Sequence, residues 1–157
     1  MPTLYTEAEY TAIRRQKNQR WLILLIPVVL LLALLAYSLV IRLQVLTSLC
    51  TILVGAILVA GYDLAIKPLR CYQNFLHNAL HGRSRTCELP FLSLSEDVNL
   101  VEGVNCRSLF CEDIDGKGRP YERLFYFDAL KTLPDIKPGQ VLRIVHHDLF
   151  VSDVSLV

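Results

Sequence analysis

The sequence predicts a membrane α+β protein made of a two-helix transmembrane hairpin, an amphipathic linker helix and a small antiparallel β-barrel-like domain. Three observations predict this class. Two long apolar runs lie close together in the first half of the chain, and cationic residues gather at their outer ends. After residue 86 the hydrophobic period changes from about 3.6 residues to about 2, as at a change from helix to strand.

Two apolar runs are long enough to cross a bilayer. Residues 21–41 contain no charge, and residues 45–66 contain Asp63 as their single charged residue. A helix rises about 1.5 Å per residue, so roughly 20 residues cross a hydrocarbon core about 30 Å thick. Because the link between the runs is very short, the sequence predicts an antiparallel transmembrane hairpin over residues 21–66.

The charges divide the chain into a basic first part and an acidic second part. Residues 1–85 contain nine Lys and Arg and three acids, a net charge of +6, whereas residues 86–157 have a net charge of −5. Cations flank the outer ends of the hairpin, which by the positive-inside rule predicts a plasma (inner) membrane protein with both termini in the cytoplasm. Residues 1–20 then form a cytosolic N-terminal arm. The five cysteines contain no C-x-x-C pair, which suits a reducing compartment.

Three groups of residues in this part of the chain are candidates for contacts with lipid or with another helix. Small residues on the second run favour close helix packing, within the hairpin or in a homo-oligomer: Gly55, Ala56, Ala60 and Gly61. Asp63 and Lys67 are spaced for an i,i+4 ion pair at the membrane interface. Five cations are placed to contact anionic lipid headgroups: Arg14, Arg15, Lys17, Arg20 and Arg70.

Residues 67–85 predict an amphipathic juxtamembrane helix. Its apolar face carries Leu69, Tyr72, Phe75, Leu76, Ala79 and Leu80, and Gly82 is placed to end it. This face can lie on the membrane surface or cover the domain that follows. His77 and His81 are spaced to share a metal, but a solvated polar stripe is the favoured interpretation because no third ligand is evident.

Residues 86–157 predict an acidic cytosolic β domain. Strands are expected over residues 87–95, 104–112, 121–128, 141–146 and 149–154, separated by turn pairs such as Glu102-Gly103 and Pro138-Gly139. Five short strands favour a small closed barrel of the OB or SH3-like kind, because closure removes exposed edges. An open sheet backed by the amphipathic helix remains the alternative.

Two patterns suggest metal sites, and both favour a simpler interpretation. Counted from Asp113, the loop DIDGKG meets an EF-hand at its first, third and sixth positions but has Lys117 at the fifth and Leu124 at the twelfth, so a hairpin turn is predicted. Cys106 and Cys111 are an odd number of residues apart and point to opposite faces of a strand. They and the adjacent His146 and His147 do not predict a zinc site.

Other function classes find less support. The sequence contains no Gly-rich phosphate loop, no G-x-S-x-G and no H-E-x-x-H, so no catalytic, cofactor-binding or metal-binding residue is predicted. Nucleic-acid binding needs basic residues, whereas the β domain is acidic. One face of the aromatic run Phe125, Tyr126 and Phe127 is a candidate partner-binding patch.

The last two predicted strands, IKPGQVLRIV from Ile136 and LFVSDV from Leu149, resemble the final hairpin of the soluble domains of NfeD-like membrane proteins. The glycine-rich, proline-containing opening of that family's barrel is absent before them. The resemblance implies an OB-type barrel behind transmembrane helices and a role in assisting membrane-protein complexes.

Together these features predict a non-catalytic membrane anchor that presents a β module to another membrane or cytosolic protein. Its partners are then the lipid bilayer and that protein, with no cofactor and no nucleic acid. Two alternatives remain: a self-oligomerising, NfeD-like membrane protein, and a membrane-tethered enzyme or metal sensor that uses Cys and His.

Overall fold

The computed structural model describes residues 4–157, which form two compact units. Residues 11–71 form one unit, and residues up to 10 together with residues 72–157 form the other. The helices are α1 (Glu7–Ile41), α2 (Gln44–Gly61), a π-helical turn η1 (Tyr62–Ile66) and α3 (Lys67–His81). The strands are β1 (Arg85–Val101), β2 (Val104–Ile114), β3 (Pro120–Asp128), β4 (Val141–His147) and β5 (Phe150–Leu156).

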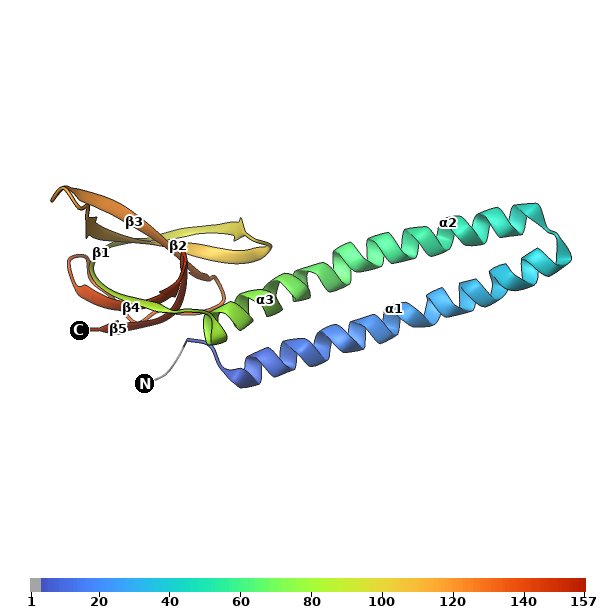
Figure 1. Cartoon of the computed structure of the whole chain (residues 1–157), viewed down its shortest axis with the longest axis horizontal. Helices are drawn as coiled ribbons and strands as arrows, with labels where there is room; N and C mark the ends of the chain where they lie inside the picture. Colours follow the sequence, from blue (N-terminus) through green and yellow to red (C-terminus); the bar gives the residue numbers. More distant parts are fainter. Residues whose placement is uncertain (1–3) are drawn as a thin grey trace. The chain divides into compact units, whose positions relative to one another are not determined.

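Helices α1 and α2 form an antiparallel hairpin (Figure 1). The less exposed residues of each helix recur every three or four positions, as in a helix pair packed along one seam. In α1 they include Leu24, Val28, Leu31, Leu35 and Ser38, and in α2 they include Cys50, Val54, Ile57 and Gly61. The remaining surface of both helices is apolar and exposed, and both helices are long and apolar enough to cross a membrane.

The short link between α1 and α2 is a Schellman motif. Arg42 has a φ of 60°, and its N–H donates to the carbonyl of Leu39 at 3.3 Å. The N–H of Leu43 reaches back to the carbonyl of Ser38 at 3.1 Å, which is the second bond of this motif. Beside the link, the hydroxyl oxygens of Ser38 and Thr47 lie 2.9 Å apart and join the two helices.

A wide turn separates α2 from α3 without interrupting the helical backbone. The N–H of Lys67 donates to the carbonyl of Tyr62, five residues earlier, and Pro68 follows at once. A proline has no N–H, and its ring crowds the carbonyl four residues before it, so we attribute the π turn to Pro68. Arg20 of α1 donates to the carbonyl of Ala65 in this turn, at 3.4 Å.

The five strands form a closed barrel in the order β1-β2-β3-β5-β4. Neighbouring strands are antiparallel, apart from a short parallel contact between β3 and β5 at Tyr126 and Phe150. Strand β1 pairs with β4 through its first half and with β2 through its second, with a register shift between Leu94 and Val98. This single long strand therefore closes the barrel.

The sheet buries both of its faces along β2. The barrel core contains Leu89, Phe91, Leu109, Cys111, Phe125, Phe127, Leu142, Ile144, Val151 and Val154. The alternate residues of β2, which point out of the barrel, are also buried: Val104, Cys106 and Ser108. Phe75 of α3 packs edge-on against Phe150 of β5, with ring centroids 5.3 Å apart. The apolar face of α3 thus covers the barrel, which selects one of the two placements expected for this helix.

The two long apolar helices and the five strands confirm the coarse architecture predicted from the sequence. The closed barrel excludes the open-sheet alternative. A capping box begins α1, because Thr6 and Glu9 exchange side-chain to backbone hydrogen bonds of 3.2 and 3.3 Å. Strand β1 extends six residues beyond its predicted end at Ser95, to Val101.

Two glycines of α2 test the hairpin packing. A Cβ on Gly61 would lie 2.1 Å from Cδ1 of Leu24, whereas a Cβ on Gly55 would meet no described atom within 4 Å. We expect Gly61→Leu to destabilise the hairpin by about 1–3 kcal/mol through overpacking. Gly55→Leu, the matched control, should leave it unchanged or more stable. Unfolding in mixed micelles measures both, and equal effects of the two variants would contradict this helix register.

Candidate functional site

The main polar cluster of the barrel unit surrounds Asp128, at the end of β3. Asp128 is 1% exposed and lies on the outer face of the sheet, beneath α3. The hydroxyl of Tyr72 donates to its Oδ2 at 2.5 Å, and the N–H of Leu130 donates to its Oδ1 at 2.9 Å. Burial and the acceptor Asp128 both raise the pKa of Tyr72, so its hydroxyl stays protonated as a donor. A buried carboxylate thus fixes α3 to the barrel.

The segment before α1 joins the same cluster. Tyr5 is 1% exposed, and its hydroxyl accepts the N–H of Asp128 at 3.2 Å. Its ring packs edge-on against Phe75 of α3, with centroids 5.3 Å apart. Burial raises the pKa of Tyr5. The residues that precede and follow the helical hairpin therefore meet on one side of the barrel.

An ion pair holds the first turn of α1 to the segment after β3. Nζ of Lys131 lies 2.5 Å from Oε1 of Glu9 and 5.5 Å from the ring centre of Tyr5. Burial raises the pKa of the Glu9 carboxyl, but the hydrogen bonds from Lys131 and Thr6 more than offset this, and the pKa lies below its usual value. We call Tyr5, Glu9, Tyr72, Asp128 and Lys131 the clasp.

A second polar group lies at one end of the barrel interior. His146 is 3% exposed, and its Nδ1 lies 2.7 Å from the carbonyl of Asp148. Because a carbonyl only accepts, Nδ1 carries the proton, and Nε2 is free to accept from Arg123 at 3.5 Å. Burial lowers the pKa of His146, as does the charge of Arg123, so the imidazole is neutral at pH 7. Cys111 belongs to the core at the same end.

The three thiols of the barrel have little nucleophilic character. Burial raises the pKa of Cys106 and of Cys111 to about 11, and it also raises the pKa of Cys87. Nucleophilic and metal-binding cysteines need a lowered pKa. Cys106 faces the clasp while Cys111 faces the core, and within residues 4–157 no three His, Cys, Asp or Glu side chains converge as a metal site would require. His147 is directed to the carbonyl of Arg83, 3.0 Å away.

The loop DIDGKG is the turn between β2 and β3. Asp113 Oδ2 accepts from Arg123 at 2.8 Å and from Tyr121 at 3.1 Å, and these bonds, the one from Arg123 above all, lower its pKa. Asp115 Oδ1 accepts the N–H of Gly116, and Gly118 takes a φ of 76°. The carboxylates and the glycine thus serve the turn itself.

The aromatic run of β3 contributes mainly to the core. Phe125 and Phe127 are 0% and 1% exposed, so their rings fill the barrel and do not reach its surface. The guanidinium of Arg123 lies 5.0 Å above the Phe125 ring. Of the three candidate partner-binding residues, Tyr126 alone points outward. It is partly exposed and lies 6.1 Å from the ring of Phe150.

The candidate residues of the helices are divided between two faces of α2. Gly61 contacts Leu24 of α1, whereas Gly55, Ala56 and Ala60 are exposed. The four small residues therefore do not form one packing face. The Asp63–Lys67 ion pair is present, with Nζ 3.2 Å from Oδ1, and both side chains are exposed.

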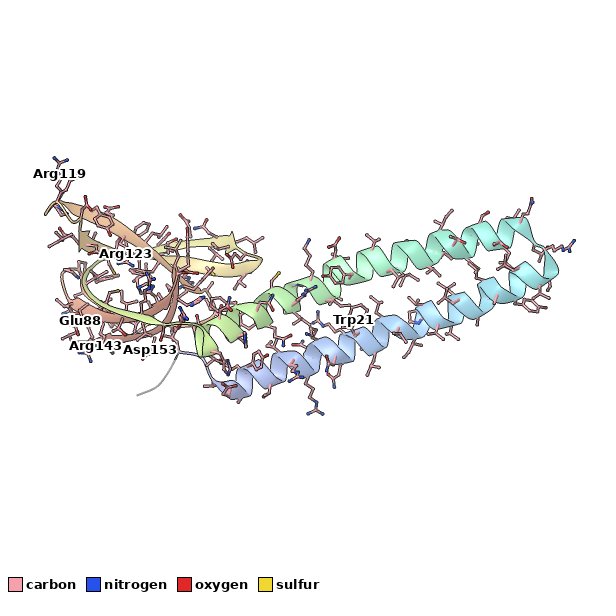
Figure 2. All side chains as sticks on the ribbon, in the orientation of Figure 1. Trp21, Glu88, Arg119, Arg123, Arg143 and Asp153 are labelled. Carbon is pink, nitrogen blue, oxygen red and sulfur yellow. The ribbon has the colours of Figure 1, made fainter. Side chains whose placement is uncertain are left out.

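The cations at the base of the hairpin have different environments. Arg14 and Arg15 are exposed, while Lys17 and Arg20 are partly buried. Arg70 donates to the hydroxyl of Tyr62 at 3.1 Å, and Arg20 donates to the π turn. Trp21 is 40% exposed at this level of the hairpin (Figure 2). Amphipathic aromatic rings beside cations are typical of membrane interfaces.

Comparison of the chain with protein-family models, curated proteins and solved structures yields no match. The likeness of the last hairpin to NfeD-like proteins therefore stays a resemblance.

Sequence reasoning missed the clasp. Tyr72 lies on the apolar face that the sequence predicts for its helix, where a hydroxyl needs a buried partner, and this is a signal for such a cluster. Nothing in the sequence identified Asp128 as the partner, because the two residues are 56 positions apart.

Removal of one clasp hydroxyl tests how far this cluster stabilises the barrel unit. Tyr72→Phe should lower the free energy of unfolding by about 1–3 kcal/mol, because it deprives a buried carboxylate of a donor. Tyr121→Phe removes the hydroxyl of an exposed residue that binds the partly buried Asp113, and it should cost less than about 0.5 kcal/mol. Thermal unfolding of the full chain in detergent compares the two, and a neutral Tyr72→Phe would show that Asp128 does not depend on this bond.

The Glu9–Lys131 pair predicts part of the acid sensitivity of the protein. Because the folded pKa of Glu9 lies below its usual value of 4.5, the pair stabilises the fold above pH 4.5 and is lost as the pH falls through the folded value. Glu9→Gln keeps the capping box and should remove well under about 1 kcal/mol at pH 7, since the pair is partly exposed.

The measurement is thermal unfolding of the full chain between neutral and acidic pH. The stability difference between wild type and Glu9→Gln should shrink towards zero in acid. The exposed Glu122, replaced by Gln, serves as the control and should leave the pH profile unchanged. A difference that persists below the folded pKa would show that the side-chain charge of Glu9 is not responsible.

Proposed function

We propose that the chain is an integral protein of the plasma (inner) membrane that presents its barrel to another protein, without catalysis of its own. The observation that carries this proposal is the surface of the hairpin. Large apolar side chains are exposed along α1 and α2, from Leu22 to Val59. Such a surface is unfavourable in water and matches a hydrocarbon core.

The distribution of charge supports a cytosolic position for both termini. The cations that flank the hairpin lie at its base, whereas Arg42 is alone at the link between the helices. The positive-inside rule favours the cytoplasmic side for the base. The barrel then faces the cytosol, where its three free thiols and its net charge of −5 over residues 86–157 are compatible with a reducing, aqueous environment.

The strand order supports an OB-like classification of the barrel. A five-stranded closed barrel with a parallel contact between β3 and β5 suits a Greek-key arrangement of this kind. Small barrels of this class serve as binding modules, and membrane attachment would raise the local concentration of the module near membrane partners. The acidic surface favours a protein partner over a nucleic acid.

Self-association through α2 is the second candidate function. The small residues Gly55, Ala56 and Ala60 lie exposed on α2, where a second copy of the helix could approach closely. Cross-linking in native membranes separates the two proposals, because a homo-oligomer and a hetero-complex give products of different mass.

Topology and partner recovery test the proposed function together. An epitope tag after Val157 should become accessible only when cells are permeabilised, while a tag at the Arg42 link should be accessible from outside.

The full chain, solubilised from native membranes, should repeatedly co-purify with the same membrane or cytosolic protein. The matched control is a chain whose hairpin is intact but whose barrel is unfolded by Leu109→Asp. A tag at Val157 that is labelled on intact cells would refute the topology, and recovery of the same proteins with the control would refute the role of the barrel.

A further inference from the structure

A cavity opens at one end of the barrel, where the segment between β3 and β4 crosses it. Its volume is about 410 Å³, within the range of roughly 300–1,000 Å³ found for small-molecule sites. Its lining is mainly apolar: Phe91, Leu94, Phe127, Leu133 and Ile136. Backbone bonds of 2.8 Å from Phe91 to Gly139 and Gln140 hold the crossing segment against β1. The walls of the cavity are therefore formed by hydrogen-bonded backbone segments and by residues of the barrel core.

An arginine without an ion-pair partner is one of the polar groups that line this cavity. Arg107 of β2 stands opposite Val98 of β1 and Phe127 of β3 and lines the cavity. Its Nε is buried without a hydrogen-bond partner, and no carboxylate of residues 4–157 forms an ion pair with it. By contrast, Arg123, Lys131 and Arg143 each pair with a carboxylate. A buried, unsatisfied guanidinium donor favours an anionic ligand.

The other charges define what this anion can be. Lys131 lines the cavity but is paired with Glu9, and the exposed Asp135 lies on the rim. Because the cavity has one unpaired cation and a carboxylate on its rim, it suits a ligand with a single negative charge. A phosphate group, which carries nearly two negative charges, suits it less well. A carboxylate matches the planar guanidinium, with two parallel hydrogen bonds.

The apolar surface continues beyond the cavity along the β1–β2 hairpin. Val98 and Leu100 are 52% and 72% exposed and share the face of Arg107. We propose that this cavity binds a fatty carboxylate, with the carboxylate on Arg107 and the chain along Phe91, Leu94 and Leu133. This site requires no partner protein, so the proposal stands apart from the function proposed above.

A photoreactive ligand tests the site in the full chain. The protein, reconstituted in nanodiscs of neutral lipid, is irradiated with a diazirine analogue of decanoic acid, and labelled peptides are identified by mass spectrometry. Label should appear in the peptides that contain Phe91–Leu94 and Lys131–Ile136. Decanoate should compete for this label at least about tenfold better than decanol, which has the same chain without a charge.

Two charge variants provide the matched comparison. Arg107→Gln should reduce the labelling of these peptides about tenfold, while Arg119→Gln should not change it. Arg119 lies at the tip of the β2–β3 hairpin and is not among the residues that line the cavity (Figure 2). Its replacement by Gln removes the same charge as Arg107→Gln does. Competition by decanol equal to that by decanoate, undiminished labelling of Arg107→Gln, or label confined to residues 21–66 would each overturn the proposal. The competition experiment uses the wild-type chain and needs no variant to fold.

Discussion

A buried carboxylate on the outside of a small barrel constrains much of this structure. Asp128 cannot be left without donors, because an unsatisfied buried charge is strongly unfavourable. One donor is local, the N–H of Leu130, but the other is the hydroxyl of Tyr72 on a helix far away in the sequence. Tyr5 accepts from the backbone of the same aspartate. The hydrogen bonds that Asp128 makes therefore bring together the chain segments that precede and follow the helical hairpin.

Glu9 also connects different parts of the chain, because its two carboxylate oxygens accept hydrogen bonds from different segments. Oε2 accepts the backbone N–H of Thr6 and completes the cap of α1, while Oε1 accepts from Lys131 after β3. The start of the helix and its attachment to the barrel are consequently coupled through one side chain. On the other side, α3 contacts the barrel directly through Tyr72 and Phe75. Residues that precede and residues that follow the helical hairpin in the sequence are thus both packed against the barrel within one compact unit.

Local patterns in the sequence were sufficient for most elements of the fold. The change of period after residue 86 located all five strands, and the apolar face of residues 67–85 identified the helix that covers them. The residues of the barrel interior were harder to predict from the sequence. Strand β2 is buried on both faces, so its hydrophobic pattern does not distinguish residues of the core from residues that contact α3. The sequence makes Phe125 and Phe127 candidates for binding a partner, but the closed barrel buries both rings. Long-range pairs such as Tyr72–Asp128 depend on tertiary packing, which a single sequence does not encode in any local period.

The division of charge also separates the tasks of the two units. A domain with a net charge of −5 is repelled by an anionic lipid surface, so the barrel would not reach such a surface by its own charge. In the membrane arrangement that we propose, attachment depends on the apolar hairpin and on the cations at its base, while the barrel surface is left for other contacts. Arg123 of the barrel is paired with Asp113 and serves the fold. Arg107 differs because its donor is buried beside a cavity and has no partner within the described chain, so stability alone does not explain why a cation occupies this position.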